Sequence, residues 1–403
     1  MVFGGDCIAK IDGKTVFVPY AIPGEKLEVE IVRECRDYSV GRIMEIIEPS
    51  PHRTEPFCSH YGTCGGCNMQ HISEEFQREL RASILEDAFR REGLEIPVVK
   101  VISGPSKGYR SRFQFHDGGL MRKMSNEIIP VENCPCADGE INEYLAETPF
   151  PRRPKGRVHA FGSEKIVSIP DGCAKMILAD EGSPEKAETV MMRRRPGGKK
   201  IRKVRPRFEG TVQKQENLCT VSLCGKNVSF DVQGFFQSNL YVLEKAIPKV
   251  VEGLSGKRVL DMYAGCGTFS VFLSDSFESV TLVEHNRDAL VHAERNMAGR
   301  KHESYGLSGD TWVRFHARGD VERNGTYDAA VIDPPRSGME KSVSGWLASS
   351  GIPQVRSLSC DIATHARDVK VLVGGGYRLK ELYLLDFYPQ TCHIESLAVL
   401  ERR

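Results

Sequence analysis

Cys360 is the residue of this chain best suited to act as a nucleophile, and it ends the short apolar run Ser357-Leu358-Ser359-Cys360. A thiolate is a strong nucleophile near neutral pH, although most free cysteines are inert core residues. Asp333 lies upstream, directly after another buried-strand pattern, and Glu395 lies downstream at the start of a last strand. Because covalent catalysis needs a nucleophile, an orienting group and a base, we predict that Cys360, Asp333 and Glu395 are catalytic.

A second pattern indicates a cofactor site. Residues 259–268 read as an apolar strand, a Gly-x-Gly turn and the start of a helix, a geometry that lets backbone amides approach a ligand. The third glycine of the dinucleotide fingerprint is missing, which argues against NAD. The next strand ends in Glu284, whose carboxylate can accept hydrogen bonds from both ribose hydroxyls. This spacing resembles class I methyltransferases and favours S-adenosylmethionine. The expected cofactor contacts are Asp261, Tyr263, Gly265, Gly267 and Glu284.

The residues after the strand that ends at 332 bear on the methylated atom. Asp333-Pro334-Pro335 followed by an aromatic residue marks enzymes that methylate amino groups, but here Arg336 takes the aromatic position. Cys360 favours methylation of uracil at C5, a carbon that is not nucleophilic in the resting ring. Thiolate addition at C6 gives C5 carbanion character, so that C5 can attack a methyl sulfonium. The C5 proton must then leave, and Glu395 is the expected base.

The cysteines indicate a metal site. Three of the 13 cysteines follow the pattern Cys58-x5-Cys64-x2-Cys67, among glycines that let a loop wrap. In a chain without an export signal, such a group favours metal binding over disulfides. Cys134 is the best candidate for a fourth ligand, and Cys136 is near enough to compete. Four thiolates suit structural zinc or an iron–sulfur cluster, and the spacing does not separate these two.

The elements that must position these residues fall into three regions. Residues 1–48 read as four short strands separated by turn signals, typical of a small β-barrel that binds nucleic acid, with the first strand expected to be truncated. Residues 55–234 are predicted to form a strand-rich central domain with the cysteine loop and an amphipathic helix at 72–92. Residues 235–403 alternate strands and helices, which predicts an α/β fold with a doubly wound, mostly parallel sheet. The strands expected there are 258–263, 279–283, 327–332, 354–358 and 377–385.

Length and composition set the class of protein. With 403 residues, of which 40% are hydrophobic, two or three globular domains are expected. No apolar run approaches the roughly 20 residues of a membrane helix, and the first residues lack an export signal, so a cytoplasmic protein is expected. The net charge of +1 hides a basic strip at 193–207 that has no acidic residue. Such a strip suits a surface that follows phosphates, although a solvated loop is the alternative because Pro196-Gly197-Gly198 interrupts it.

Taken together, the motifs resemble one enzyme family. They occur in the order Gly234–Asn239, Asp261–Thr268, Asp333–Arg336, Ser359-Cys360 with Ala363–Asp368, and His393–Ser396. This order is similar to that of the RNA 5-methyluridine methyltransferase family, and the N-terminal barrel resembles a TRAM domain, an RNA-binding module. The resemblance implies that Gln237 binds the cofactor or the uracil edge, that Glu284 binds the ribose and that Asp333 binds the target ring. It also implies that Cys360 attacks C6, that Glu395 removes the C5 proton and that the cysteine loop holds a [4Fe-4S] cluster.

One departure from the family and several alternatives follow from the same residues. The family usually has Asn and Pro after the nucleophile, whereas this chain has Asp361-Ile362, and an ionised Asp361 nearby would raise the pKa of the Cys360 thiol. An amino-methylating enzyme or a catalytically silent RNA-binding protein would have no use for Cys360 and Glu395. Ribosomal and transfer RNA are both possible substrates, and the iron–sulfur loop favours 23S ribosomal RNA. A monomer that does not bind membranes is expected.

Overall fold

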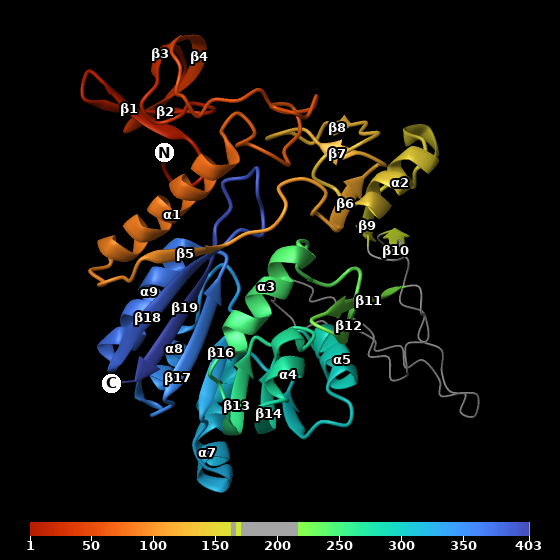
Figure 1. The fold of residues 1–403 in the computed structure, drawn as a ribbon, viewed down its shortest axis with the longest axis vertical. Helices are drawn as coiled ribbons and strands as arrows, with labels where there is room; N and C mark the ends of the chain where they lie inside the picture. The colour runs from red at the N-terminus through yellow and green to blue at the C-terminus, as the bar shows by residue number, and fades with distance from the viewer. Residues whose placement is uncertain (163–166, 171–216, 403) are drawn as a thin grey trace, which may run out of the picture.

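The computed structural model describes residues 1–162, 167–170 and 217–402, and Figure 1 shows their arrangement. The basic strip at 193–207 lies outside the described residues. Three regions follow one another along the chain: an N-terminal sheet, a small central domain and a large mixed sheet covered by helices.

The N-terminal region forms a four-stranded sheet in the order β1-β2-β4-β3, so the four predicted strands are confirmed. Asp12 and Gly13 turn the chain between β1 and β2 with φ of 49° and 80°, the left-handed conformation that a two-residue hairpin needs. Val16 and Val18 point to the same side of β2 and are buried in a small core. The strands are β1 (Cys7–Ile11), β2 (Lys14–Val18), β3 (Lys26–Glu34) and β4 (Tyr38–Glu48).

The central domain packs a short helix on a three-stranded sheet in the order β10-β9-β6. Phe113 of β6 and Ile141 of α2 belong to its core, and Cys64 and Cys134 pack against that core. The cysteine loop is therefore docked on this domain. Its elements are β6 (Arg112–His116), β7 (Leu120–Met121), β8 (Ile128–Ile129), α2 (Gly139–Glu147), the 3-10 turn Phe150–Arg152, β9 (Arg157–Phe161) and β10 (Val167–Pro170). A hairpin of β11 (Leu218–Leu223) and β12 (Lys226–Asp231) follows.

The large sheet has eight strands in the order β15-β14-β13-β16-β17-β19-β18-β5. Every strand runs in the same direction except β19, which is antiparallel to both neighbours. The order reverses between β13 and β16, the type of position where open α/β sheets bind ligands. The expected α/β sheet is confirmed. Its strands are β5 (Val99–Ile102), β13 (Gly256–Met262), β14 (Phe277–Val283), β15 (His302–Tyr305), β16 (Ala329–Ile332), β17 (Gln354–Ser359), β18 (Tyr377–Leu385) and β19 (Glu395–Arg402).

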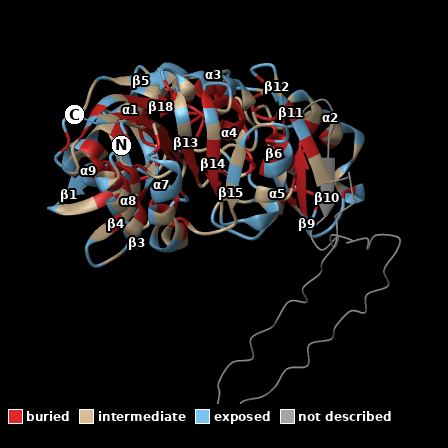
Figure 2. Ribbon diagram, turned by 90° about the horizontal axis from the view of Figure 1, so that it is seen from below, coloured by how far each residue is buried: buried red, intermediate tan, exposed pale blue. Residues whose placement is uncertain are grey.

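Helices cover both faces of this sheet, because neighbouring residues of each central strand enter different cores. Val259 belongs to the core under α3, α4 and α5, whereas Leu260 belongs to the core under α1, α8 and α9. Figure 2 shows the resulting buried strands between partly exposed helices. The helices are α1 (Glu74–Arg91), α3 (Leu240–Val251), α4 (Thr268–Leu273), α5 (Arg287–Asn296), α6 (Gly309–Trp312), the π-helical turn Val313–Ala317, α7 (Arg318–Asn324), α8 (Lys341–Ser349) and α9 (Ile362–Gly374).

The large sheet also includes a strand from the segment that the sequence assigned to the central domain. β5 lies at the edge of the sheet, parallel to β18, and Leu85 and Phe89 of α1 are buried in the core beside α9. The expected boundary at residue 235 is therefore too simple, because the segment from α1 to β5 packs with the catalytic half. The helix itself was predicted, and it begins after Ser73, although the Ser73 side chain makes no capping hydrogen bond within the described chain.

None of the helices in the described residues is both long enough and apolar enough to span a membrane.

Candidate active site and cysteine cavity

The strand register brings the predicted cofactor and catalytic residues to one edge of the sheet. Met262 of β13 is paired with Val283 of β14 on one side and with Ile332 of β16 on the other. The residues that follow these strand ends therefore emerge together at the carboxyl edge. They are Tyr263, Glu284 and Asp333.

Cys360 and Glu395 lie next to each other because of the antiparallel pairing of β17 with β19. Ser359 of β17 is paired with Ser396 of β19. Cys360 follows Ser359 and Glu395 precedes Ser396, so both residues lie where this pairing ends, and the charge of Glu395 acts on the Cys360 thiol. Glu395 is buried and Cys360 is half-buried. The structure therefore places the predicted nucleophile and the predicted base side by side.

The charged groups around Cys360 shift the pKa of its thiol in opposite directions. Burial raises the pKa of its thiol, and the carboxylates of Glu395 and Asp333 raise it further. The Arg336 guanidinium lowers the pKa through its charge and a hydrogen bond to the thiol. Arg336 is thus a functional candidate to which the sequence reasoning gave no role. Its signal was its position directly after Asp333-Pro334-Pro335.

The Glu395 carboxyl is a stronger base than an ordinary glutamate once it is ionised. Burial raises the pKa of its carboxyl to about 8, and the nearby charge of Asp333 contributes to the increase. Gln237 opposes this effect, because its Nε2 atom donates a hydrogen bond to Oε2 of Glu395 over 3.3 Å. Oε1 of Gln237 is buried and has no hydrogen-bond partner among the described residues. A buried acceptor of this kind is available for a donor group of a ligand.

Asp333 has a similarly perturbed carboxyl. Burial raises its pKa to about 7, and Glu284 adds a smaller contribution. A carboxyl near its pKa at neutral pH can act as a hydrogen-bond donor or acceptor. Gln237, Asp333, Cys360 and Glu395 thus lie close enough to interact with one another through a hydrogen bond or through charge.

The Gly-x-Gly turn has the backbone conformation that the motif requires. Gly265 and Gly267 have φ of 57° and 78°, and Tyr263 ahead of them is also in the left-handed region at 64°. No described atom lies within 4 Å of a side chain built on Gly265, so that side of the turn is open to a ligand. Gly267 instead lies against α5, where an added Cβ would be 3.2 Å from Ala293.

Glu284 is bound to this turn. Its Oε2 accepts a hydrogen bond from the backbone N–H of Gly265 over 2.8 Å, and its Oε1 accepts one from Asn286 over 2.5 Å. Asp261 lies beneath the turn, where Oδ2 accepts a hydrogen bond of 2.5 Å from the Ser270 hydroxyl. Burial raises the pKa of the Asp261 carboxyl to about 7. Asp261 is only 1% exposed, and it supports the turn from inside the protein through its hydrogen bond with Ser270.

Asp361 has a structural role that its position beside Cys360 did not indicate. Its carboxylate caps α9 and accepts hydrogen bonds from the backbone N–H groups of Ala363 and Thr364 over 3.1 Å and 2.9 Å. These are helix N-terminal donors, which stabilise a carboxylate. The pKa of the Cys360 thiol is raised mainly by burial and by the charges of Glu395 and Asp333, rather than by the expected Asp361.

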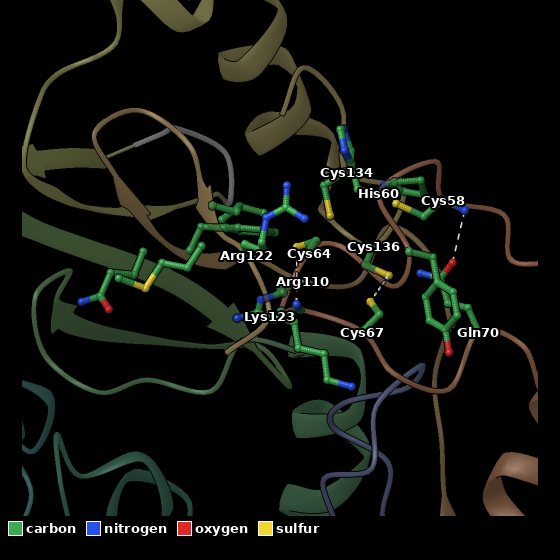
Figure 3. Close-up of a pocket in the computed structure, with 18 of the residues that line it drawn as sticks. Cys58, His60, Cys64, Cys67, Gln70, Arg110, Arg122, Lys123, Cys134 and Cys136 are labelled. Atoms are coloured by element: carbon green, nitrogen blue, oxygen red, sulfur yellow. Dashed lines mark hydrogen bonds between the residues drawn. The ribbon is translucent and has the colours of Figure 1, made fainter. Parts of the chain in front are cut away.

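The five cysteines considered as ligands line one cavity of about 690 Å³. Figure 3 shows Cys58, Cys64, Cys67, Cys134 and Cys136 around it. Sγ of Cys67 lies 3.8 Å from Sγ of Cys136. In residues 1–162 and 217–402, no three His, Cys, Asp or Glu side chains are grouped as ligands of one metal ion.

The thiols of this cavity differ in acidity. A hydrogen bond from Cys136 lowers the pKa of Cys67 and lowers that of Cys134 to about 6, and the Arg110 guanidinium acts in the same direction. Burial raises the pKa of Cys58 and Cys64. A single tetrahedral zinc ion would need its thiolates within about 4 Å of one another. The distance of 3.8 Å between Sγ of Cys67 and Sγ of Cys136 meets this requirement for that pair of thiols.

Comparison with known proteins gives relatives along the whole chain. Residues 3–44 match the TRAM domain family. A Treponema denticola protein named as an uncharacterized RNA methyltransferase is 35% identical over 441 residues, which cover 100% of this chain and 97% of that protein. An Aquifex aeolicus protein of the same name is 30% identical over 425 residues, with 100% and 96% covered. The 23S rRNA (uracil(1939)-C(5))-methyltransferase of Aeromonas salmonicida is 28% identical over 420 residues, with 98% and 93% covered.

A solved structure shares the fold. It is the Pyrococcus abyssi tRNA (uracil-54, C5)-methyltransferase in complex with S-adenosyl-L-homocysteine. The TM-score is 0.66 at 22% sequence identity, and the match covers 96% of this chain and 95% of that one. The likeness therefore extends over the N-terminal, central and catalytic regions together.

Proposed function

Since the chain belongs to the RNA methyltransferase family, we propose that it transfers a methyl group from S-adenosylmethionine to C5 of a uridine in RNA, with Cys360 as the covalent nucleophile. The observation that carries this proposal is the side-by-side placement of Cys360 and Glu395 at the ends of β17 and β19. An enzyme that methylates an amino group needs neither a nucleophilic thiol at position 360 nor a base at position 395.

The first chemical step uses Cys360. Its thiolate adds to C6 of the uracil, and the electron pair of the C5–C6 double bond moves to form an enolate with carbanion character at C5. S-adenosylmethionine, when bound, supplies an electrophilic methyl group, which C5 takes as S-adenosylhomocysteine leaves. Arg336 supports this step by lowering the pKa of the attacking thiol.

The second step uses Glu395. After methylation, C5 carries both the new methyl group and a proton. The Glu395 carboxylate removes that proton, the C5–C6 double bond re-forms and the Cys360 sulfur leaves C6. A carboxyl whose pKa lies at about 8 is a stronger base than an ordinary glutamate and is suited to this task.

The remaining residues hold the two substrates. Oε1 of Gln237 and the carboxyl of Asp333 can bind the edge of the target ring, since the first is a buried acceptor without a partner among the described residues and the charge of the second acts on Cys360 and Glu395. The open side of Gly265 and the neighbouring Glu284 can bind the cofactor and its ribose. In this arrangement Asp261 contributes by supporting the turn.

The cysteine cavity is part of the proposal. Cys58, Cys64, Cys67 and Cys134 would hold a [4Fe-4S] cluster, with Cys136 as the competing fourth ligand, because the five thiols line one cavity and the pattern Cys58-x5-Cys64-x2-Cys67 suits such a cluster. Such a cluster would tie the cysteine loop to the central domain and support RNA binding.

The proposed substrate is 23S ribosomal RNA, because a relative that matches 98% of the chain carries that activity in its name. Transfer RNA is the second candidate, since the solved structure that shares the fold acts on it. Mass spectrometry of 5-methyluridine in both RNAs from a deletion strain distinguishes these substrates. Loss of one 5-methyluridine from 23S ribosomal RNA is expected, and an unchanged ribosomal RNA with an altered transfer RNA would favour the second.

The reaction itself is tested by trapping. RNA with 5-fluorouridine should form an adduct with the protein that survives denaturation, because fluorine cannot leave C5 as the proton does. The Cys360→Ala variant should form no adduct, and Cys224→Ala, which alters an exposed cysteine, should behave like the wild type. An adduct that persists in Cys360→Ala would contradict the proposal.

A further inference from the structure

The segment 386–394 connects β18 to β19 and so determines where Glu395 starts its strand. Asp386, Gln390 and Thr391 within it are each no more than 4% exposed. Gln390 also has φ of 68°, a left-handed conformation that is strained for a non-glycine residue. Such a buried, locally strained connection keeps its shape only if its surroundings hold it.

The cysteine loop provides part of that support. The backbone N–H groups of Asn68 and Met69 both donate to the carbonyl oxygen of Gln390, over 3.1 Å and 3.0 Å. The Asn68 side chain binds the segment a second time, because its Oδ1 accepts a hydrogen bond of 2.9 Å from the backbone N–H of Cys392. Asn68 directly follows Cys67, and Cys392 is close in sequence to Glu395.

Helix α1 provides the rest. Nε2 of Gln77 donates to Oε1 of Gln390 over 2.9 Å, and the Gln390 backbone N–H donates to Oε1 of Gln77 over 3.0 Å. One turn along the helix, Arg81 forms an ion pair of 2.7 Å with Asp386. Figure 1 shows the blue segment above β18 and β19 reaching the orange chain around α1. The connection that carries the proposed base is thus held by the N-terminal half of the protein.

We propose that Asn68 is a positioning residue for Glu395, acting through Cys392 and the 386–394 segment. This inference rests on the proposed function, because it takes Glu395 as the base that removes the C5 proton. It gives the cysteine loop a second role, since the residue after Cys67 aligns the catalytic base. A displacement of the base by about 1 Å is enough to slow proton transfer.

A misplaced Glu395 would change which covalent species accumulates during the reaction. If Glu395 is misplaced, addition of Cys360 to C6 and methylation at C5 still occur, but the C5 proton stays. The double bond then cannot re-form and the sulfur cannot leave C6. A covalent complex between the protein and ordinary methylated RNA should therefore accumulate, which the wild type would resolve quickly.

The test compares Asn68→Ala with Asn68→Asp. Alanine removes the acceptor of the Cys392 N–H, whereas aspartate keeps an oxygen at the same place. For Asn68→Ala we expect kcat to fall about tenfold or more without an increase in KM for RNA, and the denaturation-resistant complex with uridine RNA to increase. Asn68→Asp should restore both. Thr54→Val is the matched control, since it removes a hydrogen bond of 3.2 Å to the carbonyl of Gln70 in the same loop without touching the segment.

Each other outcome overturns the inference. A wild-type kcat in Asn68→Ala, or a raised KM at constant kcat, would mean that Asn68 does not position the base. Loss of iron from Asn68→Ala but not from Asn68→Asp, measured on the purified protein, would assign the residue to the cysteine site instead. Absence of a 5-fluorouridine adduct in the wild type would overturn the proposed function itself, which separates the two failures.

Discussion

The side-chain amide of Gln237 donates a hydrogen bond from Nε2 to Oε2 of Glu395 over 3.3 Å. It joins the segment before α3 to the first residue of β19, two parts of the chain that are far apart in sequence. The bond stabilises the ionised carboxylate, whereas burial and the charge of Asp333 stabilise the neutral acid. The acidity of Glu395 is therefore a balance between these opposing effects.

The pH dependence of methylation should follow this balance. Below a pKa of about 8 the Glu395 carboxyl is protonated and cannot accept the C5 proton, so kcat should increase as the pH rises through about 8. Gln237→Leu removes the donor, and its midpoint should move to higher pH. Gln354→Leu, at the opposite end of β17, is the control. A midpoint in Gln237→Leu that stays the same or falls would contradict this interpretation.

The hydrogen bond beneath the cofactor turn should contribute measurably to stability. Oδ1 of Asp261 is buried without a partner among the described residues, so the Ser270 hydroxyl on Oδ2 is important to the burial of this carboxyl. Ser270→Ala should lower the free energy of unfolding by about 1–3 kcal/mol in urea denaturation. Ser274→Ala removes a half-buried bond to the Val271 carbonyl near the end of the same helix and should cost less. Equal losses in the two variants would contradict the role assigned to Ser270.

The ion pair between Arg81 and Asp386 connects α1 to the 386–394 segment and is deeply buried, with both side chains 1% exposed. Removal of one partner leaves an uncompensated buried charge, so Arg81→Met should lower the free energy of unfolding by about 3–5 kcal/mol. Arg91→Met breaks an exposed pair with Asp87 on the same helix, and its effect should stay within about 1 kcal/mol. Thermal and urea denaturation measure both. A small loss in Arg81→Met would mean that the segment is held by its other contacts.

The fourth cysteine ligand can be identified by metal content. We expect anaerobically purified protein to contain iron and sulfide, and Cys134→Ser to lose most of both, because Cys134, directly before Pro135, is the fourth ligand that the sequence pattern favours. Cys136→Ser should keep them. If Cys136→Ser loses the iron and Cys134→Ser keeps it, Cys136 is the fourth ligand. If the wild type contains zinc and no iron, the site is a zinc site and not an iron–sulfur cluster.

Local sequence determined much of this protein. Hairpin residues such as Asp12-Gly13 predict the N-terminal strands, since turn conformations depend on a few neighbouring residues. The alternation of apolar strands and helices after residue 235 predicts the sheet, and the Gly265 and Gly267 turn predicts a ligand site. The short strand β15 (His302–Tyr305) was missed, because its polar residues lack the apolar pattern of a buried strand.

Only the tertiary structure decided which distant residues meet. The register of β17 against β19 places Cys360 beside Glu395, and the pairing of β5 with β18 moves a strand from the central region into the catalytic sheet. Asp361 caps a helix instead of facing the thiol, and Asn68 reaches Cys392 across most of the chain. These relationships depend on strand register and burial, which arise from packing of the whole chain and leave no local pattern. The sequence therefore identified the chemical groups, whereas the packing decided their partners and their acidity.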